Sequence, residues 1–223
     1  MKIKKAFSMV PALAGGVILL LLAAGNLSAD QPAKKRLALM PFQLERSEGS
    51  ALVRCRTCGN VMKTGTIDGD PSETLTRIAW ELLTAQEPEY EFISPSQVEG
   101  VYQSFLAKKI EPDPLPMIKA IGQALKADGV VWGNVFRYEE RRGTAYGADR
   151  PASVALDLHL LRVNDGALVW KTQWAETQQA LSENLFQLGE VARRGLRWMT
   201  AEQLARSGLK HMLKDFPGPG LLQ

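Results

Sequence analysis

The spacing of apolar residues changes partway along the chain, and this change limits the possible folds more than any other feature. Between residues 70 and 126 apolar side chains recur every three or four positions, which is the spacing of one buried helix face. The segments 129–138, 152–163 and 167–174 instead have the character of β-strands. The sequence therefore predicts an α/β fold.

The segments follow one another in the order β-α-β-α-α-β-β-β-α-α. Early strands that alternate with helices need crossover connections, whereas consecutive late strands form a meander. We therefore expect a mixed sheet of about five strands with helices packed on it. The predicted strands are 36–42, 90–93, 129–138, 152–163 and 167–174, and the predicted helices begin at Asp70, Ser94, Leu115, Gln178 and Thr200.

The first residues have the pattern of an export signal. Residues 1–5 are basic, and residues 6–25 carry no charge. We expect residues 1–29 to be a removable signal peptide, with cleavage after Gly25 or Ala29. The alternative is an uncleaved anchor, because an uncharged stretch starting at Phe7 approaches the roughly 20 residues that cross a bilayer. Both readings place the rest of the chain in the periplasm, either free or anchored to the inner membrane.

Residues 30–35 are predicted to be a linker, residues 36–214 a single α/β domain, and residues 215–223 a C-terminal tail. Within the domain, residues 43–69 are predicted to be a long loop with a short hairpin around 61–67. The sequence has 27 Lys and Arg against 24 Asp and Glu. Three of the basic residues lie in the leader, so the mature balance is 24 minus 24, or zero, which argues against nucleic acid as a partner.

Cys55 and Cys58 are the only cysteines. In an oxidising compartment the favoured interpretation is a local disulfide. A metal site, redox chemistry and free thiols stay open as alternatives. Zinc needs four ligands, and the two histidines, His159 and His211, lie far apart in the sequence. We therefore predict no cofactor and keep Cys55 and Cys58 as a weak metal candidate.

Signals for catalysis are sparse. Asp157 and His159 lie two apart on one strand face and offer a base with its orienting carboxylate. Ser153 and Ser182 are available nucleophiles, but no Gly-x-Ser-x-Gly turn presents either one. No phosphate-binding glycine loop occurs. The favoured interpretation is a polar strand face that contacts solvent or a partner, so the chain is predicted not to be an enzyme.

Several segments resemble a group of bacterial envelope proteins, the CsgG, LpoB and TolB amino-terminal-domain type. They are Met-Pro-Phe at 40–42, Ile-Gly at 121–122, Ala-Asp-Gly-Val-Val-Trp-Gly at 127–133 and Leu-Val-Trp at 168–170. The resemblance spans most of residues 36–213. Two features depart from the group: Asn26 stands where a lipoprotein has its lipidated cysteine, and the loop with Cys55 and Cys58 is an addition.

The resemblance implies a non-catalytic accessory that binds proteins in secretion, polysaccharide export, as PelC does, or envelope assembly. Envelope proteins or further copies of this chain are the expected partners, and membrane contact is peripheral or through the leader. The charged segment 139–150 is the candidate contact surface. Its candidate residues are Glu139, Glu140, Arg141, Arg142, Tyr146 and Arg150. The alternatives are a periplasmic thiol or metal protein that uses Cys55 and Cys58, and a hydrolase that uses His159.

Overall fold

The structure is a computed structural model that describes residues 33–47, 49–107, 114–143, 148–178 and 198–223. Ala33–Gln223 forms one unit of contacts. The predicted leader, all but residue 178 of the predicted helix at 178–193, and Tyr146 lie outside the described residues.

A mixed sheet organises the fold, as the sequence predicted. Its strands run in the order β10-β9-β6-β1-β5, and the short β2 pairs with β6 as well. β1 is parallel to both β5 and β6, whereas β6, β9 and β10 form an antiparallel meander. The strands are β1 Lys35–Leu39, β2 Gln43–Leu44, β5 Tyr90–Phe92, β6 Gly129–Glu139, β9 Ser153–Arg162 and β10 Leu168–Thr177.

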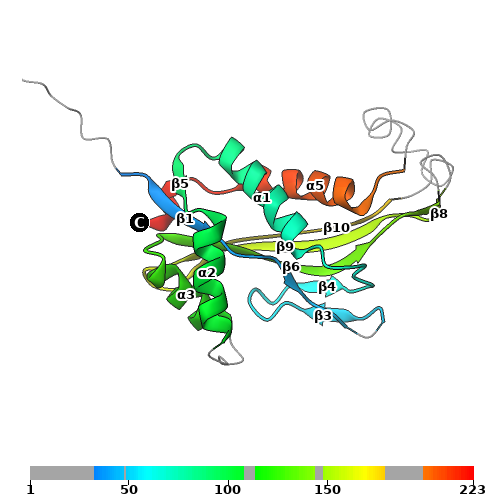
Figure 1. Ribbon diagram of the computed structural model, residues 1–223, viewed down its shortest axis with the longest axis horizontal. Helices are drawn as coiled ribbons and strands as arrows, with labels where there is room; N and C mark the ends of the chain where they lie inside the picture. Colours follow the sequence, from blue (N-terminus) through cyan, green and yellow to red (C-terminus); the bar gives the residue numbers. More distant parts are fainter. Residues whose placement is uncertain (1–32, 48, 108–113, 144–147, 179–197) are drawn as a thin grey trace, which may run out of the picture. The chain divides into compact units, whose positions relative to one another are not determined.

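Helices cover both faces of this sheet. The helices are α1 Ser72–Gln86, α2 Pro95–Leu106, α3 Pro114–Ala124 and α5 Ala201–Met212. α1 and α5 pack on one face, and α2 and α3 pack on the other (Figure 1). The helix start predicted at Thr200 is confirmed by a capping box: the Thr200 hydroxyl accepts the Gln203 N–H at 3.2 Å, and the Gln203 side chain accepts the Thr200 N–H at 3.1 Å.

A small hairpin lies beside α2 and α3 on the second face of the sheet. It consists of β3 Leu52–Arg54 and β4 Val61–Lys63, which pair antiparallel. The sequence placed a hairpin at 61–67 inside a long loop, and this placement was wrong. Val61 and Met62 belong to the second strand of a hairpin that starts at Leu52, nine residues before Val61, and the turn at 55–60 closes through its own backbone hydrogen bonds.

The structure also differs from the prediction at the end of the first strand and in the C-terminal tail. The first strand stops at Leu39, and the chain resumes pairing at β2 after Pro41. The 3₁₀ turn Leu213–Asp215 leads into the expected C-terminal tail 215–223, which contains a second 3₁₀ turn, Pro219–Leu222, and Leu222 is 3% exposed within the core. Among the described residues, no helix is long and apolar enough to cross a bilayer.

Candidate functional site

The turn of the β3–β4 hairpin supplies two of four clustered reactive side chains. Cys55 follows β3 directly, and Cys58 lies three residues further on. The Gly59 N–H donates to the Cys55 carbonyl at 3.0 Å, and the Cys55 N–H donates to the Asn60 carbonyl at 2.8 Å. Gly59 has a φ of +75°, a conformation that residues with a side chain rarely adopt. This turn places both cysteines against the sheet.

The centre of β9 supplies the other two side chains. Asp157 and His159 are two residues apart, so they point to the same face of the strand. Both are 0% exposed, because the hairpin lies over this part of the sheet. The expectation of a strand face in contact with solvent or a partner is therefore wrong for these two residues.

The four side chains converge on one point. Their ligand atoms all lie within 4.8 Å of one another. The His159 Nε2 atom is 3.7 Å from the Cys55 sulfur and 3.6 Å from Asp157 Oδ2. Both cysteines are free thiols in this structure, so a local disulfide stays a prediction.

Asn134 on the neighbouring strand β6 fixes the orientation of the Asp157 carboxyl group. Its backbone N–H donates to Asp157 Oδ1 at 2.9 Å, and its side-chain amide donates to the same oxygen at 2.8 Å. The second oxygen, Oδ2, has no hydrogen-bond partner although it is buried. The carboxyl group is therefore held by one oxygen, and the other oxygen faces the cluster.

Burial dominates the electrostatics of the cluster. Burial raises the pKa of Asp157 to about 7, against smaller opposing effects of the neighbouring Cys55 thiol and the Asn134 donors. Burial and the Asp157 charge also raise the pKa of the Cys55 thiol. Burial, together with the Lys171 charge, lowers the pKa of His159 to about 4. At neutral pH the histidine is therefore uncharged, so its ring nitrogen lone pair is available to a ligand.

The histidine ring is held in place by an aromatic neighbour. Trp132 of β6 stacks on His159 with ring centroids 4.8 Å apart and an angle of 21° between the planes. The two residues are directly opposite each other in the β6–β9 pairing. Trp132 is itself buried at 2% exposure. The imidazole consequently has little freedom to turn away from the cysteines.

The arrangement suits metal binding better than hydrolysis. Two sulfurs, one imidazole nitrogen and one carboxylate oxygen form a typical ligand set for a tetrahedral metal ion. A general base must reach a proton on its substrate. His159 is sealed beneath the hairpin, and Ser153, the described serine considered as a nucleophile, bonds to the Arg137 side chain at 2.6 Å. Ser182 lies outside the described residues.

A groove away from the cluster forms a second feature. It has a volume of about 850 Å³ and lies between the segment after β1, the start of α1 and the first turns of α2. Its aromatic lining consists of Phe42 and Tyr102, which are only 2% and 6% exposed, and Trp80, which is half-buried. Three acidic side chains also line it: Asp70, Glu73 and Glu99.

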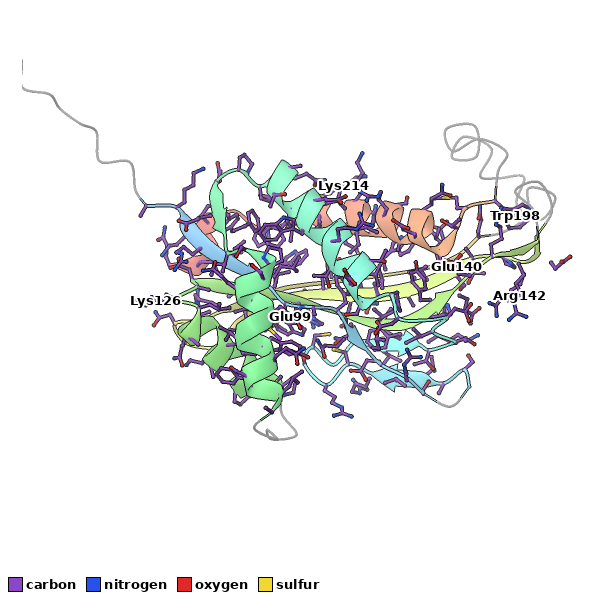
Figure 2. All side chains as sticks on the ribbon, in the orientation of Figure 1. Glu99, Lys126, Glu140, Arg142, Trp198 and Lys214 are labelled. Atoms are coloured by element: carbon purple, nitrogen blue, oxygen red, sulfur yellow. The ribbon has the colours of Figure 1, made fainter. Side chains whose placement is uncertain are left out.

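The predicted contact segment is partly engaged within the chain. Glu140 accepts the Ala201 N–H at the start of α5, and Arg150 bonds to Asp68 at 2.6 Å. Arg141 donates to the Trp198 carbonyl at 3.3 Å, and Glu139 accepts the Thr66 N–H at 3.1 Å. Arg142 is exposed. Glu140, Arg142 and Trp198 lie near one another at the end of the sheet away from Lys126 (Figure 2).

Sequence reasoning missed that Asp157 and His159 join the cysteines. The available signal was weak: two polar residues at alternate positions in a strand whose other face is wholly apolar. His211, the other histidine considered as a ligand, is exposed on α5. Cys55 and His159 are 104 residues apart, and nothing local in the sequence indicates that they meet.

The fold and the buried cluster together define an α/β protein with a mixed sheet and a hairpin closed over its second face. No protein-family profile matches the chain. No curated protein matches it in sequence either.

Solved structures give similarities of fold. A PelC dodecamer from Paraburkholderia phytofirmans has 16% identity and a TM-score of 0.46, and the alignment covers 85% of this chain and 88% of that one. The LpoB C-terminal domain from Salmonella enterica has 15% identity and a TM-score of 0.39, covering 66% and 84%. Lipoprotein GNA1162 from Neisseria meningitidis has 12% identity and a TM-score of 0.42, covering 71% and 91%.

Proposed function

We propose that this chain is an exported accessory protein of the bacterial envelope that acts by binding another protein and not by catalysis. One observation carries the proposal. Asp157 and His159 are 0% exposed beneath the hairpin, Cys55 on the hairpin is buried and Cys58 is half-buried, while aromatic and acidic side chains line an open groove elsewhere. The protein therefore acts through contacts between its surface and a partner.

The groove suits an extended segment of a partner protein. Trp80, which is half-buried, offers apolar surface, and aromatic side chains are enriched at the centre of protein interfaces. Asp70, Glu73 and Glu99 are exposed, whereas the groove's Arg77 is paired with Glu81 at 2.8 Å and Glu202 at 3.1 Å. The acidic charges therefore favour a partner segment that carries Lys or Arg beside an apolar side chain.

The location and the class of partner come from the sequence. A basic and apolar leader directs the chain to the periplasm, or anchors it there if the leader is retained. The resemblance to envelope accessories favours a role in secretion, polysaccharide export or envelope assembly, with an envelope protein or a second copy of this chain as partner. The segment 139–150 is a second proposed contact surface, with Arg142 exposed on it.

A photocrosslinking experiment tests the groove. A photoreactive amino acid replaces Gln103 at the groove, or Lys210 on the exposed side of α5 as the matched control. We expect a discrete crosslinked protein from position 103 in living cells and none from position 210. The double variant Glu73→Lys, Glu99→Lys should reduce that product at least tenfold because it reverses the charge of the groove.

A product of equal strength from both positions, or no product from position 103, contradicts the groove as the binding surface. A groove product that survives the charge reversal contradicts the proposed basic partner segment. Circular dichroism checks that the double variant folds, since Glu73 and Glu99 are both exposed.

A further inference from the structure

We propose that Cys55, Cys58, Asp157 and His159 form a structural site for one Zn²⁺ ion, which fastens the β3–β4 hairpin to the sheet. This inference is independent of the proposed binding function, because it concerns the second face of the sheet and makes no use of the groove. Two ligands come from the hairpin turn and two from β9, so one ion joins segments about a hundred residues apart in the sequence.

The spacing of the ligand atoms fits a tetrahedral ion. Zinc lies about 2.3 Å from thiolate sulfur and about 2.0–2.2 Å from imidazole nitrogen or carboxylate oxygen, so its ligand atoms are about 3.3–3.8 Å apart. The His159 nitrogen already lies 3.7 Å from the Cys55 sulfur and 3.6 Å from Asp157 Oδ2. The largest separation among the four atoms is within 4.8 Å, which a shift of about 1 Å in the hairpin turn corrects.

The unpaired oxygen of Asp157 is a second, independent observation. Oδ2 is buried without a hydrogen-bond partner, which is costly for a carboxyl group unless another ligand satisfies it. Asn134 holds Oδ1 through two donors and thereby aims Oδ2 at the cysteines and His159. Outer hydrogen bonds of this kind orient the ligands of metal sites.

The donor set selects the class of ion. Two thiolates and one imidazole exclude magnesium and calcium, which take oxygen ligands. The mixed sulfur, nitrogen and oxygen set with tetrahedral spacing favours zinc. On binding, the two thiol protons and any proton on the Asp157 carboxyl group go to solvent, and the bound site carries two thiolates and one carboxylate against the two positive charges of the ion. The Lys171 ammonium, which donates to the Cys58 carbonyl at 3.0 Å, offsets the remaining negative charge.

A closed and buried site is structural. All four coordination positions are filled by the protein, so no position is left for a substrate or an activated water. Apart from the ion, the hairpin rests on a small apolar cluster in which Met62 packs with Phe136 and Ala155, and on hydrogen bonds from the Arg137 and Lys171 side chains to two of its carbonyls, both at 3.0 Å. Two short strands with so little buried surface are marginal by themselves. An ion at the turn would therefore supply much of the attachment of the hairpin to the sheet.

Zinc binding and a Cys55–Cys58 disulfide exclude each other, because the ion needs both thiolates. The experiment uses the full chain exported to the periplasm and purified through a tag without histidine. Metal content is measured by mass spectrometry, and thiols are counted after denaturation with and without a chelator. We expect one zinc per chain and two reactive thiols once the chelator is present.

Ligand variants and a matched histidine control assign the ion to this site. Cys58→Ser, at the less buried cysteine, should weaken zinc binding more than about 100-fold in competition with a chromogenic chelator, and Asn134→Ala should weaken it about 10–100-fold. His211→Gln, which changes the exposed histidine, should leave the affinity unchanged. Cobalt added to the metal-free wild type should give the visible spectrum of a tetrahedral thiolate site, a readout that needs no variant.

The rate of trypsin cleavage tests whether the ion stabilises the hairpin. Arg54 and Arg56 flank Cys55 and are exposed, so they are cleavage points in the hairpin. We expect the chelator to speed cleavage there at least tenfold, and added zinc to restore the protection. Two oxidised sulfurs and no zinc would overturn the proposal in favour of the disulfide. Zinc bound equally by wild type and Cys58→Ser, without a cobalt thiolate spectrum, would show an adventitious ion only and would overturn it as well.

Discussion

Asn134 fixes the orientation of the buried Asp157 carboxyl group. Its backbone and side-chain donors both bond to Asp157 Oδ1, which leaves the carboxyl group one satisfied oxygen and one that faces the cysteines and His159. The amide also lies 3.8 Å from the Cys55 sulfur. Asn134 is therefore part of the cluster although it offers no metal ligand.

Removing this side chain should cost stability even without metal. Asn134→Ala leaves a buried acceptor with one donor fewer, so we expect the free energy of unfolding of the metal-free protein to fall by about 1–3 kcal/mol. Urea unfolding in the presence of a chelator measures the change. The control Asn164→Ala changes an exposed residue and should stay within about 0.5 kcal/mol of wild type. Equal losses in both variants would contradict this role of Asn134.

The sequence indicates only some residues of this cluster. Cys55 and Cys58 attract attention because they are close together in the sequence. Asp157 and His159 were read as a polar strand face, because an alternating strand does not show what covers it. The covering element, a hairpin of two three-residue strands, has too few residues to establish a period. The metal site was therefore beyond sequence analysis, although each of its ligands had been considered.

Close packing of α5 on β10 outweighs the poor helix propensity of a glycine in α5. Gly208 lies inside this helix, and a Cβ atom there would sit 2.3–2.6 Å from three ring carbons of Trp174. Gly208 therefore permits the helix to approach β10. In contrast, a Cβ atom at Gly100 of α2 would meet nothing within 4 Å.

This pair of glycines gives opposite predictions for the same substitution. Gly208→Ala should lower the free energy of unfolding by about 1–3 kcal/mol, because overpacking outweighs the gain in helix propensity. Gly100→Ala should raise it by about 0.5–1 kcal/mol, because alanine is the better helix former. Denaturant unfolding of both variants measures the two shifts. A stabilised Gly208→Ala variant would contradict the packing of α5 on β10.

The turn between β9 and β10 should make stability depend on pH. The Arg162 guanidinium donates to both carboxylate oxygens of Asp165, at 3.0 and 2.7 Å, and together with the Ala167 N–H it holds the pKa of that carboxyl well below its usual range. The folded chain then keeps Asp165 charged at a pH where the unfolded chain protonates it. The stabilisation is therefore present at neutral pH and is lost as the pH falls below about 4.

Asp165→Asn removes this charge. We expect a small decrease in Tm relative to wild type at pH 7, and the difference should shrink as the pH is lowered from 4 to 3. Thermal melts followed by circular dichroism across this range check the sign. A difference that stays constant, or grows, would show that the ion pair is not responsible.

The sequence predicts the strands and helices of this fold where the apolar period is sustained. Two examples are β9 and the start of α5, which the sequence predicts within one residue: one face of α5 packs on the sheet, and β9 is a central strand with both faces buried. The start of α2 followed from Ser94 and Pro95. The C-terminal turns had no period, and their attachment depends on tertiary contacts such as the hydrogen bond from the Tyr90 hydroxyl to the Pro217 carbonyl at 2.8 Å.

At the scale of the folded unit, the sheet divides the apolar core into two layers. The layer beneath α1 and α5 includes Leu156, Leu158 and Leu160 of β9. The layer beneath α2 and α3 includes Trp132 and Leu161, and the hairpin cluster lies on the same face. The central strands β6 and β9 thus connect the main core to the proposed metal site.

Because β9 belongs to both the main core and the proposed metal site, a substitution in its core face should lower the stability of the whole folded unit. Leu156→Ala, at 0% exposure, should cost about 2–5 kcal/mol of unfolding free energy. The matched control Leu52→Ala, at 75% exposure in the hairpin, should change it by less than about 0.5 kcal/mol. Urea unfolding followed by tryptophan fluorescence gives both values. Similar values for the two variants would contradict the assignment of β9 to the core.

X-ray absorption at the zinc edge identifies the ligand atoms around the ion and their distances in the exported protein. The account predicts two sulfur ligands at about 2.3 Å and two nitrogen or oxygen ligands at about 2.0–2.2 Å. A shell without sulfur, or a shell of four sulfurs drawn from two chains, would contradict a site built from Cys55, Cys58, Asp157 and His159.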